Sequence, residues 1–181
     1  MRILNYPHPI LRQRASEVKH IEPALRVKVQ EMLNAMYEAK GVGLAAPQMG
    51  FRQRFFVYDA HPAEEDQESE KDQEYRQGQV LINPVILEAQ GETEEEESCL
   101  SLPHVAANIK RSRKVKIAGL DLERKRVVLE AEGRLARVFQ HEIDHLDGVL
   151  IIDRMSLASR LTNAKRLRVL EKAFFEGIEC A

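Results

Sequence analysis

The segment His141-Glu142-Ile143-Asp144-His145 has the residue types and the spacing of a metal site. Residues four apart lie on the same face of a helix, so the imidazoles of His141 and His145 are expected to point the same way. Two imidazoles at this spacing can bind one divalent metal, and Glu142 lies where it can act as a general base on water. The alternative is a helix with two structural histidines. A third ligand elsewhere in the chain would favour the metal site.

Cys99 is the best candidate for that third ligand. It follows a stretch in which Glu92 and the four consecutive residues 94–97 are all glutamate. Neighbouring carboxylates raise the pKa of a thiol, which disfavours a free nucleophilic cysteine. A metal reverses this effect because it deprotonates a coordinating thiol. Cys99 is therefore more consistent with a metal ligand than with a nucleophile, whereas the glutamates by themselves are consistent with a solvated strand edge.

A third stretch, Gly41-Val42-Gly43-Leu44-Ala45-Ala46-Pro47-Gln48, is small and apolar and ends in one amide. Glycines permit close approach of the backbone to a ligand. A phosphate-binding loop would need a Lys-Ser/Thr pair that is missing here. A tight buried turn is the alternative, and this stretch alone indicates little about function.

Three helices and several short strands are predicted around these stretches. An irregular arm at residues 1–20 precedes a helix at residues 22–40. The helix of His141 follows Gly133, and a last helix is predicted from its cap Ser156 to Glu176. Strands are predicted at residues 54–59, 79–83, 85–89, 105–109, 113–121, 126–132 and 149–152. Separate short strands indicate an α+β fold in which mostly antiparallel strands surround the His-Glu-x-x-His helix, with one N-terminal and one C-terminal helix.

Three further features of the chain are predicted from local pattern. Pro84 is expected to separate the strands on either side of it. Residues 61–78 are polar and acidic and are expected to form an exposed loop. The last helix is expected to bury an apolar stripe made of Leu157, Leu161, Ala164, Leu167, Leu170 and Phe174.

Length and composition favour a single domain over residues 1–181. A formal net charge of −2 gives no support for a nucleic acid or an anionic membrane as the main partner. No run approaches the roughly 18 apolar residues of a membrane span, and the proline-containing N-terminus does not resemble a signal peptide. Cys99 and Cys180 are therefore expected to remain free thiols in a cytoplasmic protein.

Three motifs in this order resemble those of peptide deformylases. Residues 41–48 resemble Gly-x-Gly-Leu-Ala-Ala-x-Gln, residues 97–101 resemble Glu-Gly-Cys-Leu-Ser, and residues 140–148 resemble Gln-His-Glu-x-Asp-His-Leu-x-Gly. Together they are far more specific than any one alone, and the C-terminal helix is similar to that of the bacterial and organellar type. Ser98 departs from the usual glycine. It lies where the family's substrate backbone runs, so the departure bears on substrate preference and rate, not on the type of reaction.

The resemblance implies removal of the N-formyl group from the formyl-methionine of new polypeptides, with release of formate. Cys99, His141 and His145 would hold one divalent metal and leave a fourth position open for water. Glu142 would accept a proton from that water and return it to the leaving amine. The thiolate ligand suits Fe²⁺, which the family is known for, with Zn²⁺, Ni²⁺ or Co²⁺ as alternatives.

The resemblance also assigns residues that contact the substrate. The Gln48 side-chain amide and the Leu100 backbone N–H would donate to the developing oxyanion. Glu97 would pair with Arg111 and hold the cysteine strand, although both can equally be solvated. The remaining candidates for substrate binding are Val42, Gly43, Leu44, Ser98, Arg137 and Val138.

The expected partners are N-formyl-methionyl nascent peptides and, transiently, the ribosome; neither a membrane nor a specific nucleic acid is expected. The candidate ribosome-binding surface is basic and lies on the last helix, at Arg160, Lys165, Arg166 and Arg168. The alternative is a helix docked on its own domain with a solvated basic face.

Two other classes of function remain open at this point. A zinc peptidase with His-Glu-x-x-His would take its third ligand from a downstream Glu or His. No histidine follows His145, and the downstream glutamates have no local motif: Glu171, Glu176 and Glu179. A non-enzymatic binding module would be expected to have lost the base or a ligand, yet all of them are present.

Overall fold

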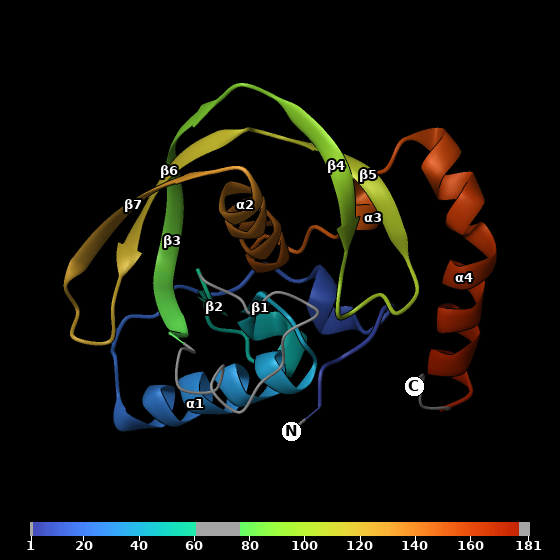
Figure 1. Ribbon diagram of the computed structural model, residues 1–181. Coiled ribbons are helices and arrows are strands. Elements are labelled where there is room, and N and C mark those ends of the chain that lie inside the picture. The colour runs from blue at the N-terminus through green and yellow to red at the C-terminus, as the bar shows by residue number, and fades with distance from the viewer. Residues whose placement is uncertain (1, 61–76, 178–181) are drawn as a thin grey trace, which may run out of the picture.

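The computed structural model describes residues 2–60 and 77–177, and in it two antiparallel sheets surround one central helix, α2 (Arg134–Leu146) (Figure 1). The larger sheet has the strand order β1-β2-β3-β6-β7, and the smaller one pairs β4 with β5. The strands are β1 (Gly43–Ala45), β2 (Phe55–Tyr58), β3 (Gln79–Gln90), β4 (Thr93–Ser98), β5 (Ala106–Arg111), β6 (Lys114–Leu120) and β7 (Arg126–Glu132). This arrangement confirms the predicted α+β class, with antiparallel strands around the His-Glu-x-x-His helix.

Helix α2 is held in place by its apolar side. Phe139 packs edge-to-face on Tyr58 of β2, with ring centroids 4.9 Å apart. Ile143 and Leu146 are buried in the same cluster, together with Ile117 from β6. The larger sheet thus covers one side of α2, which leaves another side of the helix to carry polar groups.

The N-terminal arm and the first helix pack on the other parts of the larger sheet. Within the arm, η1 (Pro9–Arg12) is a short 3₁₀ helix. Helix α1 (Pro23–Glu38) lies within the predicted range of residues 22–40, starts with proline in its first turn, and contacts β1 and β2. A second short 3₁₀ helix, η2 (Ala46–Met49), directly follows β1. The stretch at residues 41–48 therefore forms an edge strand and a turn.

Strand β3 runs through Pro84, so the predicted break at this residue is wrong. The pairing of β3 with β6 shifts its register between Ile82 and Val85, and Asn83 has a φ of 52°. Such a bulge accommodates a residue that lacks an N–H donor. The Asn83 side chain stabilises the bulge because it exchanges two hydrogen bonds with the Val18 backbone, at 2.8 and 2.9 Å.

Two further segments differ from the prediction. The acidic run forms strand β4, in which Glu97 is buried and Glu94 to Glu96 are exposed. Residues 149–152, predicted as a strand, instead lead into the short helix α3 (Ile151–Arg154). The Leu150 N–H donates to the Asp153 carboxylate at 2.8 Å, which is the local interaction that starts a helix there.

Helix α4 (Leu157–Phe175) begins as predicted, since Ser156 accepts a hydrogen bond from the Ser159 N–H. Its predicted buried stripe is confirmed at Leu170, which is 4% exposed, and wrong at Leu157 and Leu161, which are 75% and 69% exposed. The helix stands beside the β4-β5 hairpin and touches the domain along a narrow line (Figure 1). The helix residues that are buried there are Asn163, Leu170 and Ala173.

Within the described residues, no helix combines the length and the apolar character that a membrane span requires. The predicted acidic loop lies almost wholly outside the described residues, and so does Cys180.

Candidate metal centre and substrate cleft

Cys99, His141 and His145 converge at one point between β4 and α2. The Cys99 Sγ lies 3.2 Å from His145 Nε2, which lies 3.2 Å from His141 Nε2. The three candidate ligand atoms all lie within 4.8 Å of one another, and among residues 2–60 and 77–177 no other group of three such residues does so. One thiol and two imidazoles, directed at one point, fit a divalent transition metal held by three protein ligands.

The two histidines reach this point because they are one helical turn apart, whereas Cys99 reaches it because β4 ends there. Sequence spacing alone predicts the first relation. The second depends on how the β4-β5 hairpin packs against α2.

Glu97 holds the His141 ring in place. Its carboxylate lies 3.1 Å from His141 Nδ1 and accepts two hydrogen bonds from Arg111, at 2.9 and 3.0 Å, and one from Arg137, at 2.8 Å. Burial alone would raise the pKa of Glu97, but the hydrogen bonds from His141 and Arg111 outweigh it and lower the pKa to about 2. A carboxylate in this position fixes the orientation and tautomer of a metal-ligating imidazole.

The network continues behind α2. Asp144 accepts from Arg111, and it also accepts two hydrogen bonds from Arg154 of α3, at 3.0 and 2.6 Å. Arg111 is 6% exposed and Asp144 is 9% exposed, so these charges are paired in the interior as buried charges must be.

Glu142 is 4% exposed and lies against the edge of β1. Its Oε2 has no hydrogen-bond partner among the described residues. A Cβ on Gly43 would lie 2.6 Å from Glu142 Oε1 and 2.9 Å from Val138 Cγ1, so this approach requires glycine. Burial raises the pKa of Glu142 to about 7, against the opposing charge of His141.

Gln48, at the end of η2, points its amide nitrogen toward the cysteine. Its Oε1 accepts the Ala45 N–H at 2.8 Å. Its Nε2 lies 3.2 Å from Ser101 Oγ and 3.7 Å from Cys99 Sγ. Because the oxygen is engaged by the end of β1, the amide N–H groups face the cluster. Leu100 follows Cys99 directly and lines the same cleft.

The cluster opens into a cleft of about 860 Å³ between the edges of β1 and β4. A cleft of this size accommodates a short peptide segment. The predicted site residues that line it are Val42, Gly43, Gln48, Ser98, Cys99, Leu100, Arg137, Val138, His141 and Glu142. Two predicted site residues do not line the cleft. The Leu44 side chain is fully buried in the core, and His145 lies beneath the surface at 1% exposed.

Several cleft residues were not predicted from the sequence. Ser101 contacts Gln48, and the outer part of the cleft includes Lys40, Glu95, Glu96, His104 and Arg134. Among these residues, only Arg134 could have been predicted from the sequence. It lies four residues before the predicted site residue Val138 and therefore shares its helix face.

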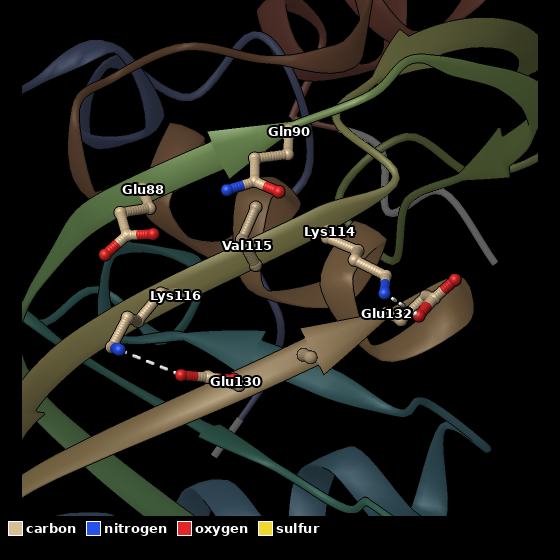
Figure 2. A pocket seen from close by; sticks show the side chains of 8 residues that line it. Glu88, Gln90, Lys114, Val115, Lys116, Glu130 and Glu132 are labelled. Atoms are coloured by element: carbon tan, nitrogen blue, oxygen red, sulfur yellow. Dashed lines mark ion pairs between the residues drawn. The ribbon is translucent and has the colours of Figure 1, made fainter.

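A separate hollow of about 260 Å³ lies on strands β3, β6 and β7 of the larger sheet (Figure 2). Four of its charged groups are paired across strands, Lys114 with Glu132 and Lys116 with Glu130, both at 2.8 Å. Pairs of this kind stabilise a sheet, and we assign no binding function to this hollow.

The fold and the site together define a metal-dependent amidase with a Cys-His-His centre. The model of the polypeptide deformylase family matches residues 1–161. The peptide deformylase of Thermotoga neapolitana is 45% identical over 174 residues, which are 95% of this chain and 97% of that protein. That of Thermodesulfovibrio yellowstonii is 40% identical over 168 residues, which are 93% of this chain and 96% of that protein.

Solved structures agree. A peptide deformylase from Plasmodium falciparum superimposes with a TM-score of 0.86 at 32% identity, over 97% of this chain and 98% of that chain. A peptide deformylase from Thermotoga maritima superimposes with a TM-score of 0.76 at 42% identity, over 86% of this chain and 97% of that chain. The chain belongs to the polypeptide deformylase family, and its activity is removal of the formyl group from N-terminal formylmethionine.

Proposed function

We propose that residues 1–181 act as one catalytic domain in which Cys99, His141 and His145 hold a single divalent metal. The observation that carries this assignment is the convergence of the three ligand atoms within 4.8 Å, beside the buried carboxylate of Glu142. When bound, the metal would polarise the formyl oxygen and lower the pKa of a water molecule.

We propose Fe²⁺ as the metal, with Zn²⁺, Ni²⁺ and Co²⁺ as substitutes. A thiolate and two imidazoles favour these ions over Mg²⁺ or Ca²⁺. The choice of iron among them rests on the family resemblance. Metal analysis of protein purified without oxygen would test it, and a centre filled with zinc under those conditions would contradict it.

The proposed role of Glu142 is proton transfer. Its carboxylate accepts the proton of the attacking water and delivers it to the amine as the carbon–nitrogen bond breaks, so that formate and a free N-terminus are released. Its unpartnered, buried Oε2 supports this role, since it leaves an acceptor available. Gln48 and the Leu100 N–H are proposed to donate to the oxyanion, a contribution of about 3–4 kcal/mol for one such donor.

The substrate is proposed to lie extended between the two strand edges. Among the described residues, β1 pairs only with β2, and β4 pairs only with β5, so each offers one unpaired edge to the cleft. An added peptide strand would be held by backbone hydrogen bonds. Its methionine side chain would contact Val42, Gly43, Val138 and the aliphatic stem of Arg137. Leu44 would contribute through its backbone alone, and Ser98 would lie beside the substrate backbone.

Nascent chains are the proposed substrates, which makes transient contact with the ribosome and a cytoplasmic location part of the proposal. Helix α4 offers Arg160, Lys165, Arg166 and Arg168 as exposed cations. Co-sedimentation with ribosomes that weakens as salt rises, and that is lost when these four residues are changed to Gln, would support this contact. No binding at low salt would contradict it.

Formate release from formyl-Met-Ala-Ser tests the proposed chemistry. We expect steady turnover with about one metal per chain, abolished by a chelator. The Glu142→Ala variant should keep its metal and lose most of its turnover, roughly 10²–10⁴-fold. Near-parent turnover in that variant would refute the role of Glu142. If the metal-loaded parent is inactive, Ser98→Gly is the variant that separates an effect of Ser98 from an incorrect assignment.

A further inference from the structure

The contacts of α2 give the cleft a direction. From the metal ligands outward, three pairs connect β4 with α2: Cys99–His145 at 3.2 Å, Glu97–His141 at 3.1 Å and Glu95–Arg137 at 3.6 Å. Residue numbers rise together in these pairs, so strand β4 runs parallel to α2. A peptide that follows the edge of β4 away from the ligands moves toward the N-terminal end of the helix.

Arg134 lies at this outer end. It is the first residue of α2, it is exposed, and it lines the cleft. It lies four residues before Val138, on the same helix face and roughly 6 Å further along the axis, at 1.5 Å per residue. The Arg134 side chain makes no hydrogen bond or ion pair within the described part of the chain.

The charge of Arg134 is also uncompensated. The cations and anions behind the cleft form one balanced network: Arg111, Arg137 and Arg154 with Glu95, Glu97 and Asp144. Glu96 follows Glu95 in β4, so its side chain projects from the opposite face of the strand. The outer end of the cleft is thus electropositive on the side of α2.

We propose that Arg134 selects for an acidic side chain on the third residue of the substrate. This inference rests on the proposed function, because it places the side chain of the formyl-methionine on Val138. In an extended peptide, residues i and i+2 share a face and are roughly 6.6–6.8 Å apart. This spacing matches the roughly 6 Å rise from Val138 to Arg134. The third side chain therefore meets Arg134, whereas the second projects to the side of Glu96 and Ser98.

The test compares kcat/KM for formate release from three peptides with amidated C-termini: formyl-Met-Ala-Glu, formyl-Met-Ala-Gln and formyl-Met-Ala-Lys. Because an exposed ion pair contributes little, we expect the Glu peptide to exceed the Lys peptide about three- to fivefold. The ratio should fall to about one in Arg134→Gln and persist in Arg134→Lys. In about 0.5 M sodium chloride the ratio for the parent should also approach one, because salt screens exposed charges.

Two controls make the result specific. Arg52→Gln removes an exposed arginine outside the residues that line the cleft and should keep the ratio of the parent. Moving the charge to the second position, in formyl-Met-Glu-Ala and formyl-Met-Lys-Ala amides, should give a ratio that Arg134→Gln does not change. No preference in the parent, or a preference that survives in Arg134→Gln, would overturn the proposal.

Binding measurements separate this proposal from the proposed function. The Glu142→Ala variant should bind the Glu peptide more tightly than the Lys peptide in an NMR titration, and adding Arg134→Gln should remove the difference. If the parent releases no formate while this binding difference is present, the proposed chemistry fails and the role of Arg134 stands. Equal binding of the two peptides would overturn the role of Arg134 whatever the parent catalyses.

Discussion

At the scale of single residues, the site depends on how closely the backbone of β1 approaches α2. Gly43 is the contact point: it leaves the Glu142 carboxylate and the Val138 side chain no room for a larger neighbour. The same approach lets β1 form one wall of the cleft while Gln48, a few residues on, directs its amide toward Cys99.

Gly43→Ala tests this close contact. The added Cβ would lie 2.6 Å from Glu142 Oε1, so either the carboxylate or the strand must move. A displacement of about 1 Å in a positioned group costs up to roughly 100-fold in rate. We therefore expect kcat for formate release to fall by about 10–100-fold, while the bound metal, counted per chain, is unchanged.

The matched control is Gly133→Ala, since a Cβ at Gly133 meets no atom within 4 Å. That residue has a φ of 61°, so its substitution lowers stability without touching the cleft. Parent-like kcat in Gly43→Ala would show that the contact of β1 with Glu142 is not needed for turnover.

At the scale of elements, the metal centre lies where two independently formed pieces meet. The β4-β5 hairpin supplies Cys99, and α2 supplies both histidines. Glu97 connects them, because it lies on the hairpin and contacts His141 and Arg137 of the helix.

Glu97→Gln should weaken this connection. An amide keeps the size of the side chain but removes the charge that faces Arg111 and Arg137, and it orients His141 less well. Loss of such a supporting group typically lowers metal affinity about 10–100-fold. Competition with a chelator of known affinity measures the change. Glu95→Gln is the control, because the Glu95 side chain is half exposed, lies 3.6 Å from Arg137 and contacts neither histidine. The metal affinity of this variant should match that of the parent. Equal affinities in both variants would contradict the role of Glu97.

The helices after α2 depend on a smaller contact, between Asp153 of α3 and Arg12 of the N-terminal arm. Burial alone would raise the pKa of Asp153, but hydrogen bonds from Arg12 and from the Leu150 N–H lower it below its ordinary value. Because the folded-state pKa lies below the unfolded-state pKa, this stabilisation is present above the unfolded value and is lost as the pH falls through the folded value.

Asp153→Ala should therefore destabilise the fold in a pH-dependent way. We expect a loss of about 0.5–1 kcal/mol in the free energy of unfolding at pH 7, a figure that allows for solvent screening of a side chain about one-third exposed. The difference from the parent should shrink as the pH falls below the ordinary pKa of an aspartate. Urea unfolding of the metal-free proteins at several pH values measures it, and a constant difference across that range would contradict the pKa argument.

Sequence pattern predicted those elements whose residues interact locally. The site helix, the Ser156 cap and the antiparallel class all follow from spacing and capping. The predictions from sequence failed for elements whose extent or burial depends on contacts with residues far away in the chain. Pro84 stays in β3 because Asn83 is tied to Val18, a residue far away in the chain. Leu157 and Leu161 are exposed, whereas residues further along α4 contact β5 and the N-terminal arm: Asn163, Glu171 and Phe174.

At the scale of the whole molecule, the two sheets are joined around α2 by contacts that converge on the metal ligands. Bound metal would hold the end of the β4-β5 hairpin to the helix, while the larger sheet holds the helix from the other side. An ion that binds the folded chain and not the unfolded chain stabilises the whole fold by mass action. We therefore expect a bound metal to contribute to stability as well as to catalysis.

Metal removal should accordingly lower the thermal midpoint of unfolding. With free metal at roughly 1,000 times its dissociation constant, the bound ion contributes about 4 kcal/mol. For a domain of this length, that corresponds to a fall in Tm on the order of 10 °C when a chelator is added. Calorimetric scans of the parent with and without chelator measure it. Cys99→Ser, which replaces the thiol with a poorer ligand, should show a much smaller difference between the two scans. A chelator effect of the same size in Cys99→Ser would mean that the stabilising ion binds elsewhere, and it would remove Cys99 from the ligand set.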